Sequence, residues 1–229
     1  MTIDSNSHPS TFQSTWRHNP DPTALPFPRD NPPFQLTAID WQQLSLTDSQ
    51  FTAHTWSDLH SLISTNQLDE LKRWPSFLKA YLAWTAHVKA EYGSATQYLL
   101  QQRLFWTPLS ATGPLRFELK NEVPFADEAD FRILKNDWSY AVTPGISHIV
   151  VWLKQPLSVD GEGALTIEGR KQVDDFVRAR FRVPAGEEKE GEKVQWFKNT
   201  TNLQSVRSLE HLHVLVRDVP EEILKTWMN

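Results

Sequence analysis

The stretch Glu210-His-Leu-His-Val-Leu-Val-Arg217 determines how the second half of this chain is interpreted. Because side chains alternate between the two faces of a β-strand, the aliphatic residues at positions 212, 214 and 216 share one face, which we expect to be buried. His211 and His213 then share the opposite face, about 7 Å apart along the strand. A histidine pair opposite a fully apolar face predicts a functional site, although histidines that only form hydrogen bonds across a core would give the same pattern.

A second strand is predicted from His148-Ile-Val-Val-Trp-Leu-Lys154, which is apolar and rich in β-branched residues. His148 and Lys154 stand at positions of the same parity, so they share one face of that strand. If this strand lies beside the histidine strand, three imidazoles meet in one place. We therefore take His148, His211 and His213 as the candidate catalytic residues and Lys154 as a candidate substrate ligand.

Polar groups precede the histidine strand in residues 196–206, Trp-Phe-Lys-Asn-Thr-Thr-Asn-Leu-Gln-Ser-Val. Asn199, Gln204 and Ser205 carry amide and hydroxyl groups that suit the oxygens of a phosphate or carboxylate, or that orient an imidazole. Lys198 is a further candidate substrate ligand. Trp196 is either part of the core or the wall of a pocket.

Composition excludes several kinds of chemistry. The 229 residues include no cysteine, so disulfides, thiolate zinc sites, iron–sulfur clusters and a cysteine nucleophile are excluded. A net charge of −5 argues against a nucleic-acid or anionic-membrane partner, and no apolar run approaches the length of a membrane span. Without a secretory signal pattern, we expect a cytoplasmic or nuclear protein with a small-molecule substrate, no cofactor, and a homodimer as a candidate assembly.

The chain is predicted to be an α+β protein with a preceding arm. Residues 1–33 hold seven of the 15 prolines and predict a flexible arm, which aromatic side chains such as Phe27 would pin to the body. Residues 34–229 are predicted to form one domain, with a helical part over 34–106 and a sheet part over 130–229. Capping-box patterns at Thr37, Thr47, Thr55 and Ser94 indicate the helix starts, and Thr166 starts a crossover helix between strands.

Many segments, in order, resemble the N-acetylglucosamine-induced protein family of fungi, a family of unknown function. They are Thr37-Ala-Ile-Asp-Trp41, His54-Thr-Trp56, Leu71-Lys-Arg73, Tyr81-Leu-Ala-Trp84, Glu91-Tyr-Gly93, Lys135-Asn-Asp-Trp138, His148-Ile-Val-Val-Trp152, Trp196-Phe-Lys-Asn199, Leu203-Gln-Ser-Val206 and Glu210-His-Leu-His-Val-Leu-Val216. The chain departs from the family pattern with Ser139 in place of Pro, Ala141 in place of Gly and Thr200 in place of Trp. These departures favour a paralogue with a different substrate, for example in a secondary-metabolite pathway.

A more distant similarity connects the sheet part to the histidine-triad superfamily. His148-Ile-Val-Val-Trp-Leu-Lys154 and Gln204-Ser-Val206 match that pattern, but the triad itself is incomplete. In one register His213 takes the position of the nucleophile, and in the other His211 does. The resemblance implies a metal-independent hydrolase or transferase that acts on a nucleotide or sugar-phosphate ester through a covalent histidine intermediate, on a histidine-triad-like antiparallel sheet.

Three other functions are compatible with the same residues. The first is an acid/base cyclase, isomerase or lyase, with Asp137 as a partner carboxylate and Trp138 among its aromatic walls. The second is a metal site of three imidazoles, since His-x-His on a strand has metal-ligand spacing. The third is a non-catalytic protein of a sugar response.

Overall fold

The computed structural model describes residues 25, 27–32, 36–161, 163–200 and 203–228, and the chain divides into two compact units. The first unit comprises Met1–Ala53, Lys72–Ala95 and Asp137–Ala141, and the second comprises His54–Leu71, Thr96–Asn136 and Val142–Asn229. Most of the predicted arm, residues 1–33, lies outside the described residues. The single domain predicted over residues 34–229 stays a prediction.

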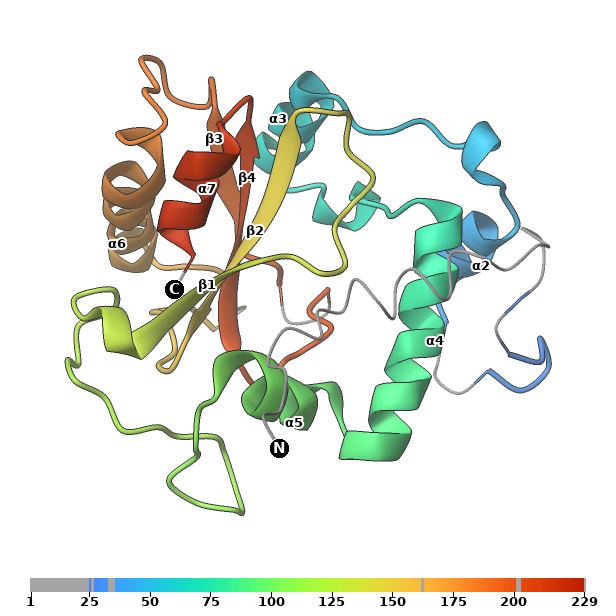
Figure 1. Cartoon of the computed structure of the whole chain (residues 1–229), viewed down its shortest axis with the longest axis horizontal. Coiled ribbons are helices and arrows are strands. Elements are labelled where there is room, and N and C mark those ends of the chain that lie inside the picture. Colours follow the sequence, from blue (N-terminus) through green and yellow to red (C-terminus); the bar gives the residue numbers. More distant parts are fainter. Residues whose placement is uncertain (1–24, 26, 33–35, 162, 201–202, 229) are drawn as a thin grey trace. The chain divides into compact units, whose positions relative to one another are not determined.

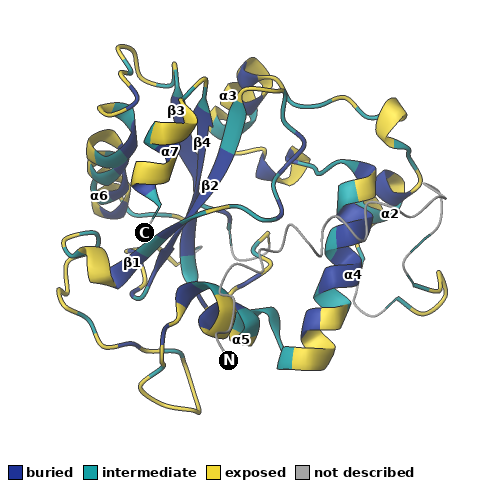
Figure 2. Ribbon diagram, viewed as in Figure 1, coloured by how far each residue is buried: buried dark blue, intermediate teal, exposed yellow. Residues whose placement is uncertain are grey.

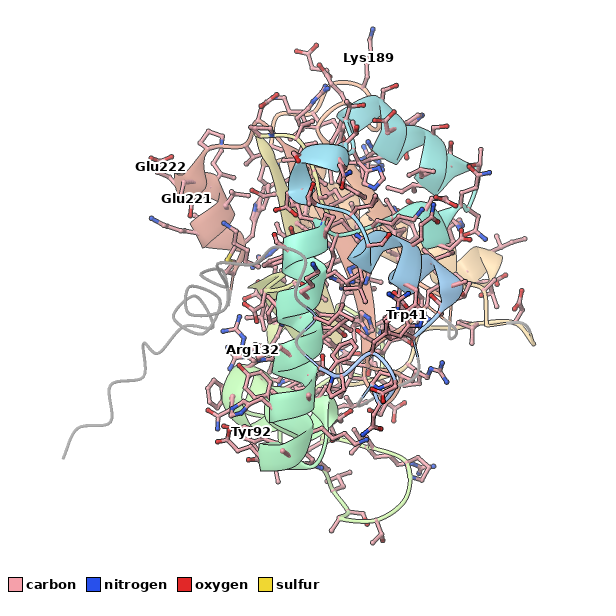
Figure 3. All side chains as sticks on the ribbon, turned by 90° about the vertical axis from the view of Figure 1, so that its right-hand side faces the viewer. Trp41, Tyr92, Arg132, Lys189, Glu221 and Glu222 are labelled. Carbon is pink, nitrogen blue, oxygen red and sulfur yellow. The ribbon has the colours of Figure 1, made fainter. Side chains whose placement is uncertain are left out.

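Two helices, α2 (Ala38–Leu44) and α4 (Pro75–Tyr92), form most of the described part of the first unit, together with the short 3₁₀-helix η1 (Asp48–Gln50). The predicted capping box starts α2. The Thr37 hydroxyl accepts a hydrogen bond from the backbone N–H of Asp40, and the Asp40 carboxylate accepts one from the backbone N–H of Thr37. Gly93 ends α4 in the left-handed conformation at φ 78°. Figure 3 shows Trp41 on α2 and Tyr92 in the last turn of α4.

Apolar side chains of α2 and α4 pack together. Leu44, Leu78 and Leu82 are buried, and Phe27 and Trp41 pack against them. The Phe27 ring lies edge-on to Trp41 at 6.4 Å, so this part of the predicted arm is held against α2.

The second unit contains an antiparallel sheet of four strands in the order β1-β2-β4-β3 (Figure 1). The strands are β1 (Phe131–Lys135), β2 (Ile146–Leu153), β3 (Val194–Phe197) and β4 (Glu210–Arg217). Helix α6 (Ile167–Val177) connects β2 to β3, which are separated by β4 and therefore form a crossover connection. The α+β class, with helices followed by an antiparallel sheet and one crossover helix, is confirmed.

The remaining elements of the second unit are short. They are α3 (Trp56–Ser64), η2 (Leu68–Glu70), α5 (Ala95–Leu99), the π-helical η3 (Leu100–Leu104), η4 (Glu128–Asp130), the π-helical η5 (Arg178–Arg182) and α7 (Glu221–Trp227). Within the described ranges, none of the helices combines the length and apolar character that crossing a bilayer requires.

The core of the second unit lies between one face of the sheet and the helices α6 and α7, which cover that face in Figure 1. Its members include Ile133, Leu212 and Phe181, all with 0% exposure. Helix α6 approaches its neighbours so closely that a Cβ on Gly169 would lie 2.5 Å from the Ser158 carbonyl oxygen. Figure 2 shows β2 and β4 buried along most of their length, and within them only the two end residues of β4 and the first two residues of β2 are partly exposed.

Candidate functional site

The histidines lie on the sheet face opposite to the core. In the β2–β4 register, Val150 is paired with His213 and Trp152 with His211, so the alternate positions 148, 150 and 152 of β2 share a face with both histidines of β4. On the other side of β4, Phe197 is paired with His213 and its ring stacks on the imidazole at 4.9 Å. His148, His211 and His213 are 2%, 4% and 7% exposed. The expectation that three imidazoles gather on one face therefore agrees with the structure.

A row of four hydrogen-bonded side chains crosses this face. Nε2 of His148 lies 2.9 Å from Nδ1 of His213. Nδ2 of Asn136 lies 3.2 Å from His148 Nε2, and Nδ2 of Asn199 lies 3.2 Å from His213 Nε2. The two asparagines follow β1 and β3, so each strand of the sheet supplies one member of the row.

The row occupies both ring nitrogens of His213. Nδ1 of His213 faces Nε2 of His148 at 2.9 Å, and Nε2 of His213 faces the side-chain amide of Asn199 at 3.2 Å. Neither nitrogen of His213 therefore points to an open position where a substrate could bind.

His211 is held differently. Its Nδ1–H donates to the backbone carbonyl of Leu209 at 2.9 Å, which leaves the lone pair of the neutral ring on Nε2. No hydrogen bond from the described residues reaches that Nε2 atom. The Trp152 ring lies at 4.7 Å with a tilt of 33°, and the His213 ring lies nearly perpendicular at 5.3 Å.

The environment of His211 disfavours its charged form. Burial lowers the pKa of His211 below its ordinary value, and the positive charge of Lys198 acts in the same direction. The hydrogen bond to Leu209 and the charge of Glu210 oppose this shift with smaller effects. His211 is therefore a neutral imidazole near pH 7, with the electronic form of a nucleophile or a general base.

The two candidate lysines are engaged in ion pairs. Lys198 Nζ lies 3.2 Å from Glu210 Oε1, with both side chains largely buried, and Glu210 stands at the parity of the core face. Lys154 Nζ lies 3.4 Å from the buried carboxylate of Asp130 and donates to the carbonyl of Glu118. Both predicted substrate ligands therefore have structural partners.

Trp196 does not line the histidine face. It is paired with Val214 and belongs to the core cluster beneath α6, where its Nε1–H donates to Asp174 at 2.8 Å. The prediction gave Trp196 either a place in the core or a pocket wall, and its indole faces away from the imidazoles. Strand parity within β3 explains this, since Phe197 takes the histidine side.

Of the remaining predicted residues, Gln204 is linked to the site by a hydrogen bond. Gln204 Nε2 donates to the backbone carbonyl of Asn199 at 2.9 Å and so supports the end of the row. Ser205 is exposed, and no hydrogen bond joins it to the histidines in the part of the chain that the structure describes. Asp137 and Trp138 belong to the first unit, where the Trp138 ring packs on α4 through Phe77, Tyr81 and Trp84 at 5.1 to 5.4 Å.

Three groups of the site were not predicted from the sequence. They are the amide of Asn136, the ring of Phe197 and the carbonyl of Leu209. Asn136 had a signal, because it continues the alternation of the Phe131–Lys135 strand and so points to one face with positions 132 and 134. No sequence pattern could have indicated the Leu209 carbonyl, since every residue has a backbone carbonyl.

The three imidazoles do not form a ligand set for a metal ion. The nitrogens of His148 and His213 are directed to one another and to asparagine amides, and Nδ1 of His211 is directed to a carbonyl. Among the described residues, no group of three or more His, Asp or Glu side chains is arranged to hold a metal.

A family model described as "Protein of unknown function (DUF3605)" matches residues 55–217, which include every residue of the row and His211. The chain belongs to the DUF3605 family. Two relatives extend the match. N-acetylglucosamine-induced protein 1 of Candida albicans is 28% identical over 182 residues, covering 74% of this chain and 70% of the relative. A Saccharomyces cerevisiae protein described as uncharacterized is 30% identical over 185 residues, covering 76% and 85%.

The family resemblance expected from the sequence is thereby confirmed. Among solved structures, the crystal structure of HTC1 matches this DUF3605 chain with a TM-score of 0.59 and 26% sequence identity, covering 76% of this chain and 92% of that one.

Proposed function

We propose that this DUF3605 protein is a histidine-dependent hydrolase or transferase that acts on a nucleotide or sugar-phosphate ester, with His211 as the nucleophile. The observation that carries the proposal is the hydrogen bond from Nδ1–H of His211 to the Leu209 carbonyl at 2.9 Å. It holds a buried, neutral imidazole in the tautomer whose lone pair is on Nε2. That is the state a histidine needs in order to attack phosphorus.

The histidine row supports the choice between the two registers. His213 as nucleophile requires a free lone pair on its ring, but Nδ1 faces His148 and Nε2 faces Asn199. His211 has one nitrogen bound and one left for the reaction. The proposal therefore adopts the register in which Leu209 stands at the first position of the triad.

The proposed reaction has two balanced steps. In the first, Nε2 of His211 attacks the phosphorus of the ester, the Nε2–P bond forms, and the bond from phosphorus to the leaving oxygen breaks as that oxygen takes up a proton. In the second, water attacks phosphorus, the Nε2–P bond breaks, and one proton of the water is released. Throughout, Nδ1–H stays on the Leu209 carbonyl, which stabilises the positive charge that the ring acquires when Nε2 is substituted.

The His148–His213 pair would assist this reaction by its position. The His213 ring lies 5.3 Å from the His211 ring and nearly perpendicular to it. Because both nitrogens of His213 are engaged in the row, the pair would hold the His211 ring in position and would not itself donate to the substrate. Asn136 and Asn199 are positioning residues in this scheme, because each contacts a histidine of the pair.

Turnover and covalent trapping test the proposal. The full chain is incubated with nucleoside phosphoramidates, dinucleoside polyphosphates and N-acetylglucosamine phosphate esters, the last because a relative is named for induction by that sugar. We expect product release and a mass adduct on the intact protein after a neutral quench. His211→Asn keeps a donor for the Leu209 carbonyl and lacks Nε2, so we expect turnover to fall at least about 1,000-fold.

His60→Asn is the matched control, because His60 is an exposed histidine of α3 in the same unit. We expect it to retain full turnover. Absence of turnover and of nucleotide binding with every compound would contradict the proposal. Full biological function after replacement of both His211 and His213 would instead support a non-catalytic role in a sugar response.

A second candidate function rests on the aromatic rings. Trp152 lies over His211 at 4.7 Å and Phe197 stacks on His213, so an apolar substrate would meet aromatic walls beside a neutral imidazole base. This arrangement suits an acid/base cyclase, isomerase or lyase. Stabilisation against heat by apolar ligands, with no effect of nucleotides, would favour it over phosphoryl transfer.

A further inference from the structure

A pocket of about 490 Å³ lies at the β3 edge of the second unit and is not used by the proposed reaction. Its walls come from the end of α3 and the residues that follow it, from residues 163–165, from the first turns of α6, and from β3 with the residues after it. Small-molecule sites in proteins have volumes of about 300 to 1,000 Å³, so this pocket has room for one such ligand.

The lining of this pocket is cationic. It contains Arg170 and Lys198, and no acidic residue is present among its described members. Lys198 is already neutralised by Glu210 at 3.2 Å. Arg170 makes no ion pair within the described residues, and its guanidinium lies 5.3 Å from the centroid of the Trp196 ring.

The Arg170 guanidinium is held in place by the aromatic ring beneath it. The Trp196 indole is itself fixed, because its ring is 8% exposed and its Nε1–H donates to Asp174 at 2.8 Å. A guanidinium stacked on an immobile indole still presents its N–H edge, in the fork geometry that matches a carboxylate or a phosphate. The position of Arg170 is therefore partly preorganised for an anion.

Apolar surface surrounds this charge. Leu68, Leu165 and Phe197 line the same pocket, and Ser64 and Asn66 add polar groups. A ligand that fills the pocket must therefore combine one anionic group with an apolar body. A bare inorganic ion would leave the apolar lining unused.

We propose that this pocket binds a small organic anion, a carboxylate or phosphate monoester with an aromatic or aliphatic body, and that Arg170 holds the anionic group. Phe197 and Lys198 adjoin both this pocket and the histidine face, whereas Arg170 lines the pocket and has no part in the reaction assigned to His211. Failure of this proposal, tested at Arg170, is therefore distinguishable from failure of the proposed reaction, tested at His211.

Binding of three matched compounds tests this assignment on the full chain. Phenylacetate carries a carboxylate and phenyl phosphate carries a phosphate, each attached to a phenyl group. Phenylacetamide is the neutral analogue of phenylacetate. Titrations are followed by the indole N–H resonances in NMR spectra, with the Trp196 signal identified from Trp196→Phe. We expect a saturable shift of the Trp196 resonance with at least one anion, and binding of phenylacetamide at least tenfold weaker.

Two variants test the role of the residues. Arg170→Gln should weaken binding of the anion at least tenfold. Arg178 is an exposed arginine at the end of the same helix and does not line the pocket, so Arg178→Gln should leave the affinity unchanged. Ala164→Phe places a ring in the pocket from an exposed position and should abolish the shift.

A preference for one of the two anions identifies the carboxylate or the phosphate as the ligand group. The proposal is overturned if no compound shifts the Trp196 resonance, if the neutral analogue binds as tightly as the anions, or if Arg170→Gln binds like the unmodified chain.

Discussion

Replacing His211 by asparagine should change how the stability of this DUF3605 protein depends on pH. The asparagine amide retains a donor for the Leu209 carbonyl, but it cannot take up a proton. In the native chain the buried imidazole is held neutral, because burial lowers its pKa below the ordinary value of 6.5. The variant therefore removes one titratable group, the His211 imidazole, and keeps a hydrogen bond to the Leu209 carbonyl.

The sign and size of the effect follow from proton linkage. Above pH 6.5 His211 is neutral in both the folded and the unfolded chain, so its contribution to stability is fully present. As the pH falls below 6.5, the unfolded chain takes up a proton that the folded chain does not, and stability is lost until the folded pKa is reached. For one proton the slope is at most about 1.4 kcal/mol per pH unit.

Urea unfolding at pH 7.5, 6.5, 5.5 and 5.0 measures this slope. We expect the free energy of unfolding of the native chain to fall more steeply below pH 6.5 than that of His211→Asn, with the difference approaching the slope of one proton. His60→Asn, which removes an exposed histidine, should follow the native curve. Parallel curves for the native chain and His211→Asn would refute a buried, neutral His211.

Three further substitutions test the packing around the site. Lys198→Met leaves the largely buried Glu210 carboxylate unpaired and should cost about 3–5 kcal/mol in urea unfolding, part of which the double variant with Glu210→Leu should recover. Gly169→Ala places a Cβ 2.5 Å from a backbone carbonyl oxygen and should cost about 1–3 kcal/mol, seen as a lower thermal midpoint. Phe181→Ala empties a fully buried position and should cost about 3–5 kcal/mol in the same assay, whereas Phe105→Ala, at a side chain that is 68% exposed, should cost far less.

The features predicted correctly from the sequence depend on local regularity. Alternation along residues 210–217 was enough to place His211 and His213 on one face, because the period of a strand is fixed by its backbone. His148 joins them through the pairing of β2 with β4, which the sequence analysis gave as a condition. The helix starts at Thr37, Thr55 and Thr166 were equally local, since each cap involves residues three positions apart.

The features that the sequence left open depend on register and on the path of the backbone. The side of the sheet that Trp196 faces is set by the pairing of β3 with β4, which no spacing within residues 194–197 reveals. Asp137 and Trp138 stand directly after the row residue Asn136 and belong to the first unit, and the role predicted for them stays a prediction.

The choice of the proposed nucleophile was also beyond the sequence. Both registers of the histidine-triad pattern fitted the residues, and the groups that favour one of them are a backbone carbonyl at Leu209 and an amide that reaches His213 from Asn199. Neither contact follows from the spacing of the histidines along the chain.

The tautomer of His211 tests the central claim most directly. Nitrogen-15 NMR of the histidine side chains, with His211 assigned by comparison with His211→Asn, distinguishes a ring nitrogen that carries a proton from one that carries a lone pair. We predict a protonated Nδ1 and a lone pair on Nε2 from pH 8 down to pH 6.5. A proton on Nε2, or a doubly protonated ring at pH 7, would contradict the assignment of His211 as the nucleophile.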